Sequence, residues 1–130
     1  MGMSGFWFFM LVMAMLVPLT MMFFGCLFYY KPPKRINGIY GYRTRMSCKN
    51  QQTWDFAHKY CGKLWTLIGI AALPLSGACM CIVIRSDIDT IGIWGGVLVM
   101  LQSVMLILTI PLTERALRKN FDAYGMKKEE

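Results

Sequence analysis

The chain has 130 residues, of which 56% are hydrophobic and 16% are charged, and its formal net charge is +7. It is about one domain long and too apolar for an ordinary soluble domain. Charged side chains are absent from residues 1–30, 64–84 and 90–113. Each of these runs reaches the roughly 20 residues that a helix needs to cross a hydrocarbon core of about 30 Å. The sequence therefore predicts an integral membrane protein of the all-α class.

Three apolar runs make a three-helix bundle the simplest arrangement. The first run lacks the basic start and the shorter apolar core of a secretory signal peptide, so we expect it to be retained as a helix. Residues 1–130 then form a single membrane domain. The predicted spans lie at about residues 6–29, 64–84 and 90–111, with a polar loop at residues 31–63 and a polar tail at residues 112–130.

Lys and Arg residues are concentrated in two of the polar segments. The loop at residues 31–63 holds eight of them against one acidic residue, and the tail after Pro111 holds five. Short loops rich in Lys and Arg stay in the cytoplasm. We therefore predict a multi-pass plasma-membrane protein with this loop and the C-terminus in the cytoplasm and the N-terminus outside. The basic charge then indicates contact with membrane lipids that carry anionic headgroups, and no direct contact with nucleic acid is expected.

The first predicted helix carries Pro18 at its middle, where the missing backbone N–H commonly produces a kink. Gln102 is the strongly polar side chain well inside a predicted span. Because a buried amide needs hydrogen-bond partners, we expect Gln102 to face the bundle and to bond a hydroxyl or a freed carbonyl near Pro18 or Pro74. The spans contain no Asp, Glu, Lys, Arg or His, which argues against an ion pump or a proton relay.

The later part of the polar loop predicts an amphipathic interfacial helix. Trp54, Ala57 and Cys61 recur at helical spacing, while charged residues occupy another face. Ser47 or Asn50 is the expected N-cap, because either side chain can accept from free amides of the first turn. This helix would lie along the membrane surface with its Trp at headgroup level, or it would pack its apolar stripe on the other helices.

Small residues in the second and third spans predict close helix packing, since lipid supplies no hydrophobic drive for helix association. Gly69, Ala72 and Ser76 lie near one face of the second span, and Gly92 and Gly96 form a GxxxG pair in the third. We expect these surfaces to pair the two helices as an antiparallel hairpin. The alternative is a homodimer formed through the GxxxG pair.

The polar tail predicts a short C-terminal amphipathic helix. Leu117, Phe121 and Tyr124 recur at helical spacing, with Thr113 as the candidate cap and Gly125 as the candidate stop.

The stretch NGIYGYRTRMS, at residues 37–47, combines turn-forming glycines with Asn, Thr and Arg. Arg43 beside Thr44 can present a guanidinium and backbone amides to a phosphate or a carboxylate. In the alternative, Arg43 stabilises the loop by bonding carbonyls or Asp55. His58 has no nearby set of metal-binding or catalytic partners, so we expect a surface or interfacial His, and we predict no metal, no cofactor and no catalytic residue.

The polar loop also resembles the signature of the SdpI family, bacterial integral membrane proteins, in their short three-helix form. The similarity runs from about residue 37 to residue 64, with one predicted helix before it and two after it. Where the family motif commonly has Pro after the Arg-Thr pair, this chain has Arg45. The matching residues are Asn37, Gly41, Tyr42, Arg43, Thr44, Ser47, Asn50, Trp54, Ala57, His58, Lys59 and Gly62.

The resemblance implies immunity against a membrane-active peptide toxin and signalling through a cytoplasmic transcriptional repressor. We therefore expect a non-enzymatic immunity or signalling protein whose loop binds a partner or a lipid headgroup. A lipid-phosphate-binding membrane enzyme and a structural subunit of a larger membrane complex are the alternatives. The predicted binding residues of the loop are Asn37, Gly38, Gly41, Tyr42, Arg43, Thr44, Ser47, Asn50, Trp54 and His58.

Overall fold

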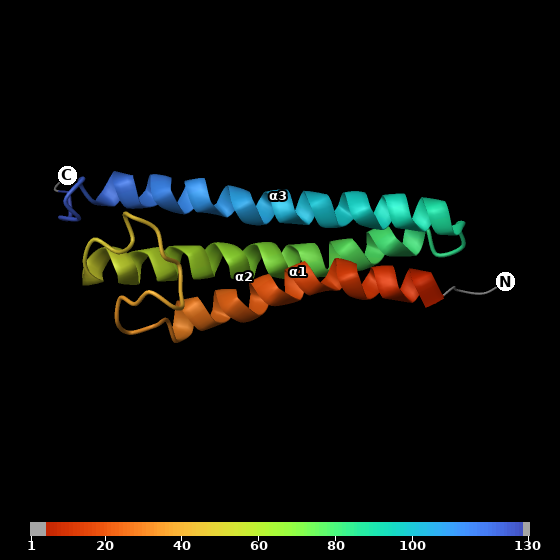
Figure 1. Ribbon diagram of the computed structural model, residues 1–130, viewed down its shortest axis with the longest axis horizontal. Helices are drawn as coiled ribbons and strands as arrows, with labels where there is room; N and C mark the ends of the chain where they lie inside the picture. Colours follow the sequence, from red (N-terminus) through yellow and green to blue (C-terminus); the bar gives the residue numbers. More distant parts are fainter. Residues whose placement is uncertain (1–4, 129–130) are drawn as a thin grey trace.

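The computed structural model describes residues 5–128, which form three α-helices packed side by side along one long axis (Figure 1). The helices are α1 (Gly5–Tyr30), α2 (Gln51–Ile82) and α3 (Ile88–Asn120). Each helix is long and apolar enough to cross a membrane. The predicted all-α, three-helix architecture is confirmed, while the ends of the predicted domain, residues 1–4 and 129–130, lie outside the described residues.

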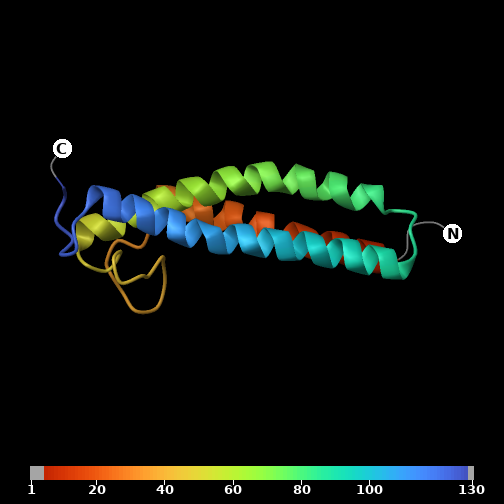
Figure 2. The ribbon, with the colours of Figure 1, turned by 90° about the horizontal axis from the view of Figure 1, so that it is seen from above.

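Helix α2 runs antiparallel to both α1 and α3 (Figure 1). The long loop between α1 and α2 therefore lies at the same end of the bundle as the chain that follows α3. The short turn between α2 and α3 lies at the other end, beside the start of α1. Seen from above, the long loop projects to one side of the bundle (Figure 2). The two Lys- and Arg-rich segments thus share one end of the molecule.

The helices extend well beyond the predicted spans. Helix α2 begins at Gln51, so the segment expected to form a separate interfacial helix is instead the first part of α2. Its 32 residues make a rod about 48 Å long, which exceeds a hydrocarbon core of about 30 Å. Helix α3 likewise continues through Pro111 to Asn120. The expected separate tail helix is therefore wrong, and Thr113, its expected cap, bonds the carbonyl of Thr109 inside α3.

The start of α2 is fixed by Asn50, as predicted for one of the two candidate caps. The Asn50 side chain accepts from the backbone N–H of Thr53 at 2.9 Å, and the Thr53 hydroxyl accepts from the Asn50 N–H at 3.0 Å. This reciprocal pair is a capping box that satisfies two otherwise free donors. At the other end of the molecule, Asp87 caps α3 by accepting from the Thr90 N–H at 3.1 Å.

Helices α1 and α2 approach until their backbones touch. A Cβ atom added at Gly62 would lie 2.6 Å from the carbonyl oxygen of Gly25, and one added at Gly25 would lie 2.6 Å from the backbone nitrogen of Thr66. One added at Gly69 would lie 2.9 Å from the carbonyl oxygen of Pro18. Glycine is required at these positions because any side chain would push the helices apart.

Gly69 and Gly92 do not form the expected small-residue contact between α2 and α3. Gly69 faces α1, and on α3 Gly92 lies against the α1 residue Phe6. Helix α1 supplies the large Phe and Met side chains that lie beside these glycines. Glycines of α2 and of α3 therefore pack against α1. A Cβ atom added at Gly96 would meet no atom of another described element within 4 Å, whereas one added at the preceding residue, Gly95, would contact Met10 of α1.

One amide joins all three helices near the middle of the bundle. Gln102 of α3 donates from Nε2 to the carbonyl oxygen of Ala14 at 2.8 Å and to Oγ of Ser76 at 2.6 Å. Ala14 precedes Pro18 by four residues, so its carbonyl is the one that the missing proline N–H leaves free. The predicted role of Gln102 is confirmed.

Candidate functional site

The loop that joins α1 to α2, residues 31–50, begins with two sharp turns. The side-chain oxygen of Asn37 accepts from the backbone N–H groups of Ile39 and Tyr40, at 2.9 and 2.7 Å. Gly41 then takes a φ of +118°, and a Cβ atom there would lie 2.6 Å from Nε2 of His58. Only glycine fits this conformation and this close approach without strain. The loop is thereby folded back over the start of α2.

His58 supports the loop from below and is completely buried. Its Nε2 accepts from the backbone N–H of Tyr42 at 2.9 Å, so Nδ1 carries the ring proton and donates to the carbonyl oxygen of Trp54 at 2.8 Å. The prediction of a surface or interfacial His is therefore wrong. The reason is the loop itself, which returns across this face of α2 and covers the imidazole.

Trp54 is the second buried support. Its side chain has no exposed surface, and its Nε1 donates to the carbonyl oxygen of Pro33 at 2.7 Å. Its ring lies against His58, with centroids 4.3 Å apart. Of the two alternatives predicted for this segment, the structure shows the packed one, because the start of the loop covers the indole and accepts its N–H through Pro33.

The hydroxyl groups of the loop bond one another and the backbone. Ser47 Oγ accepts from the Thr44 N–H at 2.8 Å and donates to the carbonyl oxygen of Tyr42 at 3.0 Å. Thr44 Oγ1 accepts from the Ser47 N–H at 3.1 Å. These reciprocal bonds close a compact turn just before the cap of α2.

Arg43 is exposed and donates from Nη1 to the carbonyl oxygen of Gly38 at 2.7 Å. The structure thus shows the predicted alternative in which Arg43 stabilises the loop by bonding a carbonyl. Asp55, the other partner considered, accepts from Gln51 Nε2 at 2.8 Å. Because Thr44 bonds Ser47 while Arg43 bonds Gly38, the two side chains do not converge on one shared acceptor.

Asn50 links the loop to the chain that follows α3. Besides capping α2, it donates from Nδ2 to the carbonyl oxygen of Gly125 at 2.6 Å. Gly125 has a φ of +82°, and a Cβ atom there would lie 2.7 Å from that same amide nitrogen. The turn is closed by Asp122, whose carboxylate accepts from the N–H groups of Tyr124 and Met126. Gly125 therefore belongs to a turn held against the loop, five residues beyond the end of α3.

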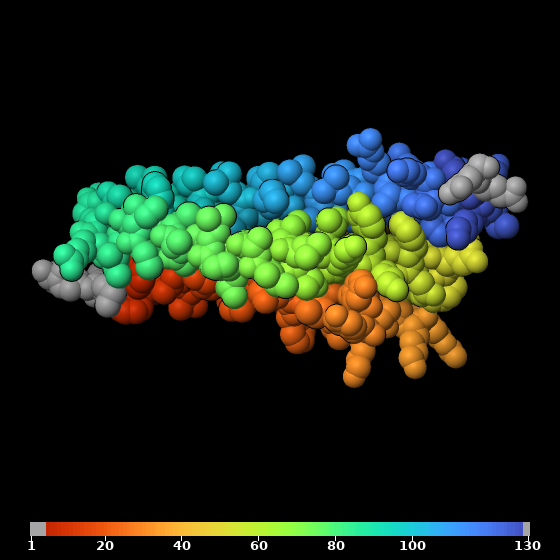
Figure 3. Space-filling view, turned by 180° about the vertical axis from the view of Figure 1, so that it is seen from behind, coloured from red at the N-terminus to blue at the C-terminus, as the bar shows by residue number. Residues whose placement is uncertain are grey.

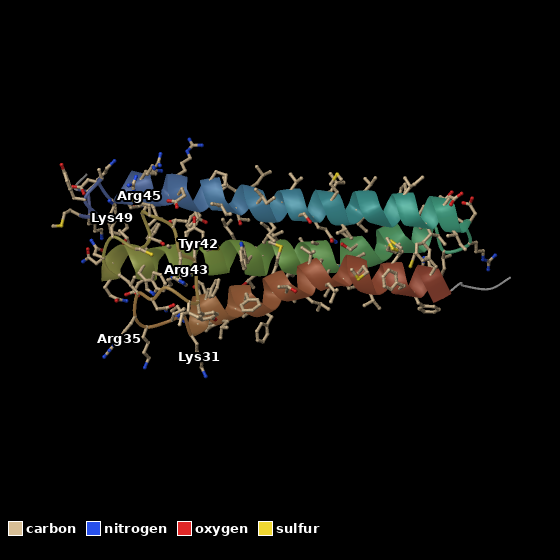
Figure 4. The ribbon with its side chains drawn as sticks, viewed as in Figure 1. Lys31, Arg35, Tyr42, Arg43, Arg45 and Lys49 are labelled. Carbon is tan, nitrogen blue, oxygen red and sulfur yellow. The ribbon has the colours of Figure 1, made fainter. Side chains whose placement is uncertain are left out.

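A cavity of about 760 Å³ lies where the loop, the end of α3 and this turn meet. The sequence does not predict this cavity, because residues 45–49 and 114–128 are far apart in the chain. The sequence shows only that Arg45 departs from the family motif. In Figure 4 Arg45 and Lys49 lie toward the end of α3. The cavity is lined by Arg45, Met46, Lys49, Glu114, Arg118, Phe121, Asp122, Ala123 and Lys128.

Tyr42 lies between the buried side of the loop and Glu114. Its phenol donates to the carbonyl oxygen of Ile110 at 3.3 Å. Burial raises the pKa of Tyr42 well above its usual value, and the negative charge of the nearby Glu114 carboxylate raises that pKa further. The phenol therefore stays protonated and acts as a hydrogen-bond donor at neutral pH.

A second basic surface faces away from the cavity. Lys31 and Arg35 point outward on the α1 side (Figure 4), and the start of the loop forms the projecting side chains in the space-filling view (Figure 3). Lys34 is also exposed, and Ile39 at the tip of the turn is 89% exposed. We call these four residues the outer loop surface. Within residues 5–128, no group of three or more His, Cys, Asp or Glu could hold a metal ion.

Three long apolar helices and a tightly bonded polar loop at one end define a helical membrane protein of the multi-pass type. The chain belongs to the SdpI/YfhL protein family, whose model matches residues 34–113. YfhL of Bacillus subtilis (strain 168) is 46% identical over 46 residues, which are 35% of this chain and 42% of that protein. The match thus spans less than half of the relative. No solved structure matches the chain, and neither the name of the family nor that of the relative describes an enzymatic activity.

Proposed function

We propose that the chain is a non-enzymatic membrane protein that protects the cell from a membrane-active peptide toxin, and that its loop binds a protein partner in the cytoplasm. The observation that carries this proposal is the use of the motif side chains inside the loop. His58, Trp54 and Ser47 bond the loop backbone, and Arg43 bonds Gly38. A loop held so firmly presents a fixed surface, as recognition requires.

The outer loop surface is the part of the loop that we assign to the partner. Lys31, Lys34 and Arg35 are exposed, and Ile39, four residues after Arg35, is exposed as well. Exposed cations and an exposed apolar side chain on one short loop suit an acidic protein segment that carries an apolar anchor. A cytoplasmic transcriptional repressor is the partner class that the family resemblance suggests.

The membrane orientation belongs to the same proposal. The two basic segments share one end of the bundle, and we place that end in the cytoplasm and the start of α1 outside the plasma membrane. The exposed Gly96 on α3 offers a small-residue face on which a second copy could pack.

The proposal is tested by measuring how much peptide toxin a cell tolerates when it makes each variant. Arg43→Ala should lose most of the protection, because the bond to Gly38 that holds the outer turn is lost. The double variant Lys34→Gln, Arg35→Gln should lose it as well, although neither side chain supports the loop.

Arg85→Gln, at the opposite end of the bundle, removes a cation without touching the loop and should protect normally. All variants must first be found in the membrane at equal amounts. Full protection by both loop variants would contradict the proposal.

A further inference from the structure

We propose that the cavity between the loop, the end of α3 and the following turn binds a phosphate ester that also carries hydroxyl groups. This inference goes beyond the protective function and does not depend on it. The outer loop surface, assigned above to a protein partner, lies on another side of the loop and takes no part in the site.

The positive charge of the cavity is not neutralised from within. Four of its lining residues are cations, Arg45, Lys49, Arg118 and Lys128. Glu114 and Asp122 line the same cavity, so the lining has a formal excess of two positive charges. Within residues 5–128 the four cationic side chains make neither an ion pair nor a hydrogen bond. Unpaired cations around one concave space favour an anion.

The two carboxylates of the cavity differ in the hydrogen bonds that they accept. Asp122 accepts from two backbone N–H groups of its own turn and is a structural residue. Among residues 5–128, the buried Oε2 atom of Glu114 has no hydrogen-bond partner. A buried acceptor without a donor is costly, and a shift of the Glu114 side chain toward the cavity that it lines would let a ligand hydroxyl remove that cost. A bare phosphate lacks such a donor, whereas a glycerol ester of phosphate supplies both the anion and the hydroxyls.

The size and position of the cavity fit this class of ligand. A volume of about 760 Å³ exceeds the need of inorganic phosphate and lies in the range of sites for small organic molecules. Glu114 is the first charged residue after the uncharged run at residues 90–113, so the cavity lies where α3 leaves the apolar layer. A lipid headgroup and a free phosphate ester from solution could both reach it.

The wall formed by the final turn depends on one side chain. Asn50 Nδ2 holds the carbonyl of Gly125, and the backbone of that turn carries Asp122 and Lys128 into the cavity. Asn50→Ser keeps a neutral oxygen to cap α2 but removes the donor to Gly125. This variant should weaken ligand binding while it leaves the cap in place, which separates the closure of the cavity from its charge.

The experiment measures thermal unfolding of the purified full chain in phosphatidylcholine nanodiscs. The added probes are glycerol phosphate, inorganic phosphate, or phosphatidylglycerol in the disc itself. The protein should unfold at a higher temperature with glycerol phosphate or phosphatidylglycerol. A shift with both identifies the free ester as sufficient, and a shift with phosphatidylglycerol alone identifies a lipid headgroup. Either result supports the site.

The charge of the cavity is tested with Arg45→Gln combined with Arg118→Gln. This variant should bind the effective probe about tenfold or more weakly, since it removes two hydrogen-bond donors that carry a positive charge. The matched control, Lys31→Gln combined with Arg35→Gln, removes the same charge from the outer loop surface and should bind normally. Equal losses in both variants, or no shift with either phosphate ester in the wild-type protein, would overturn the proposal.

Glu114→Gln tests whether Glu114 binds the hydroxyl groups of the ligand. The test is whether the affinity for each probe rises or falls. The substitution makes the cavity more positive, so inorganic phosphate should bind at least as well as before. Glycerol phosphate should lose affinity relative to inorganic phosphate, because an ionised acceptor for its hydroxyls is gone. If both probes gain equally, the carboxylate merely repels anions and the hydroxyl assignment is wrong.

Discussion

The middle of the bundle and its loop end are held together by different means. In the middle, α1 and α2 touch through Gly69, and one side chain, Gln102, connects all three helices. At the loop end, apolar side chains form a buried cluster, and the buried imidazole of His58 bonds the loop above it. That cluster consists of Tyr42, Met46, Ala57, Cys61, Leu117 and Phe121.

The difference follows from the surroundings of each region. Lipid tails are as apolar as the side chains they contact, so helices in the middle gain little by burying them and rely on close backbone packing. Water next to the loop end restores the hydrophobic drive, and a core like that of a soluble protein forms there. Added volume should therefore be most damaging in the middle, and lost hydrogen bonds should be most damaging at the loop.

The largest effect is expected from Gly69→Ala. Its new methyl group would lie 2.9 Å from the carbonyl oxygen of Pro18 and 3.0 Å from the backbone nitrogen of Met22, and relief requires the helices to move apart. We expect a loss of about 2–3 kcal/mol, as for other overpacked sites. The measurement is thermal or denaturant unfolding in detergent micelles.

Gly96→Ala is the matched control, since the same methyl group would meet no atom of another helix within 4 Å in the part of the chain that the structure describes. Here the better helix propensity of Ala should stabilise the protein by up to about 1 kcal/mol. The two substitutions should thus have opposite signs. Equal signs would contradict the packing described for α1 and α2, and a fall in oligomer mass in Gly96→Ala would reveal a dimer contact.

The next largest effect is expected at the loop from His58→Leu. This substitution leaves the buried N–H of Tyr42 without an acceptor, which costs about 1–3 kcal/mol. Hydrogen exchange at the Tyr42 amide should become faster by one or two orders of magnitude, about the factor that this energy predicts. The exposed neighbour Lys59 provides the control, and Lys59→Gln should leave the exchange rate unchanged.

Gln102→Leu should have a smaller effect, about 1 kcal/mol, because hydrogen bonds between membrane helices contribute modestly. The cost should fall in a Pro18→Ala background, where the amide of residue 18 can again reach the carbonyl of Ala14. A double-mutant cycle measured by unfolding gives this coupling directly. Additive effects would show that Gln102 and the proline do not share that carbonyl.

The smallest effect is expected at the exposed turn before α3. The hydrogen bonds that Asp87 accepts from Thr90 lower the pKa of its carboxyl below the ordinary value. Because the folded-state pKa is the lower one, this cap stabilises the fold above the unfolded pKa of about 3.9. The stabilisation disappears as the pH falls through the folded pKa. Asp87→Asn keeps a good cap and should remove this part of the acid dependence of unfolding.

The sequence predicts the elements that depend on local pattern. The uncharged runs predict all three helices, the loop composition predicts Asn50 as one of two candidate caps, and the isolated amide at Gln102 predicts its interhelical bonds. Each of these predictions follows from residues that are close in the sequence or from the rule that buried polar groups need hydrogen-bond partners.

Features that depend on the return of a loop or on helix rotation could not be predicted. The burial of His58 requires knowing that the loop folds back over α2, and the contact of Gly62 with Gly25 requires knowing which faces of α1 and α2 meet. The cavity beside Arg45 requires the chain after α3 to turn back toward the loop. None of these relations leaves a periodic signal in the sequence.

The shared carbonyl of Ala14 has a consequence for how relatives of this protein diverge. Pro18 creates an acceptor that its own helix cannot satisfy, and Gln102 on another helix satisfies it. A lineage that loses the proline removes the need for the amide, and one that loses the amide leaves the proline with an orphaned oxygen in an apolar layer. The two positions are therefore expected to co-vary, 84 residues apart in the chain.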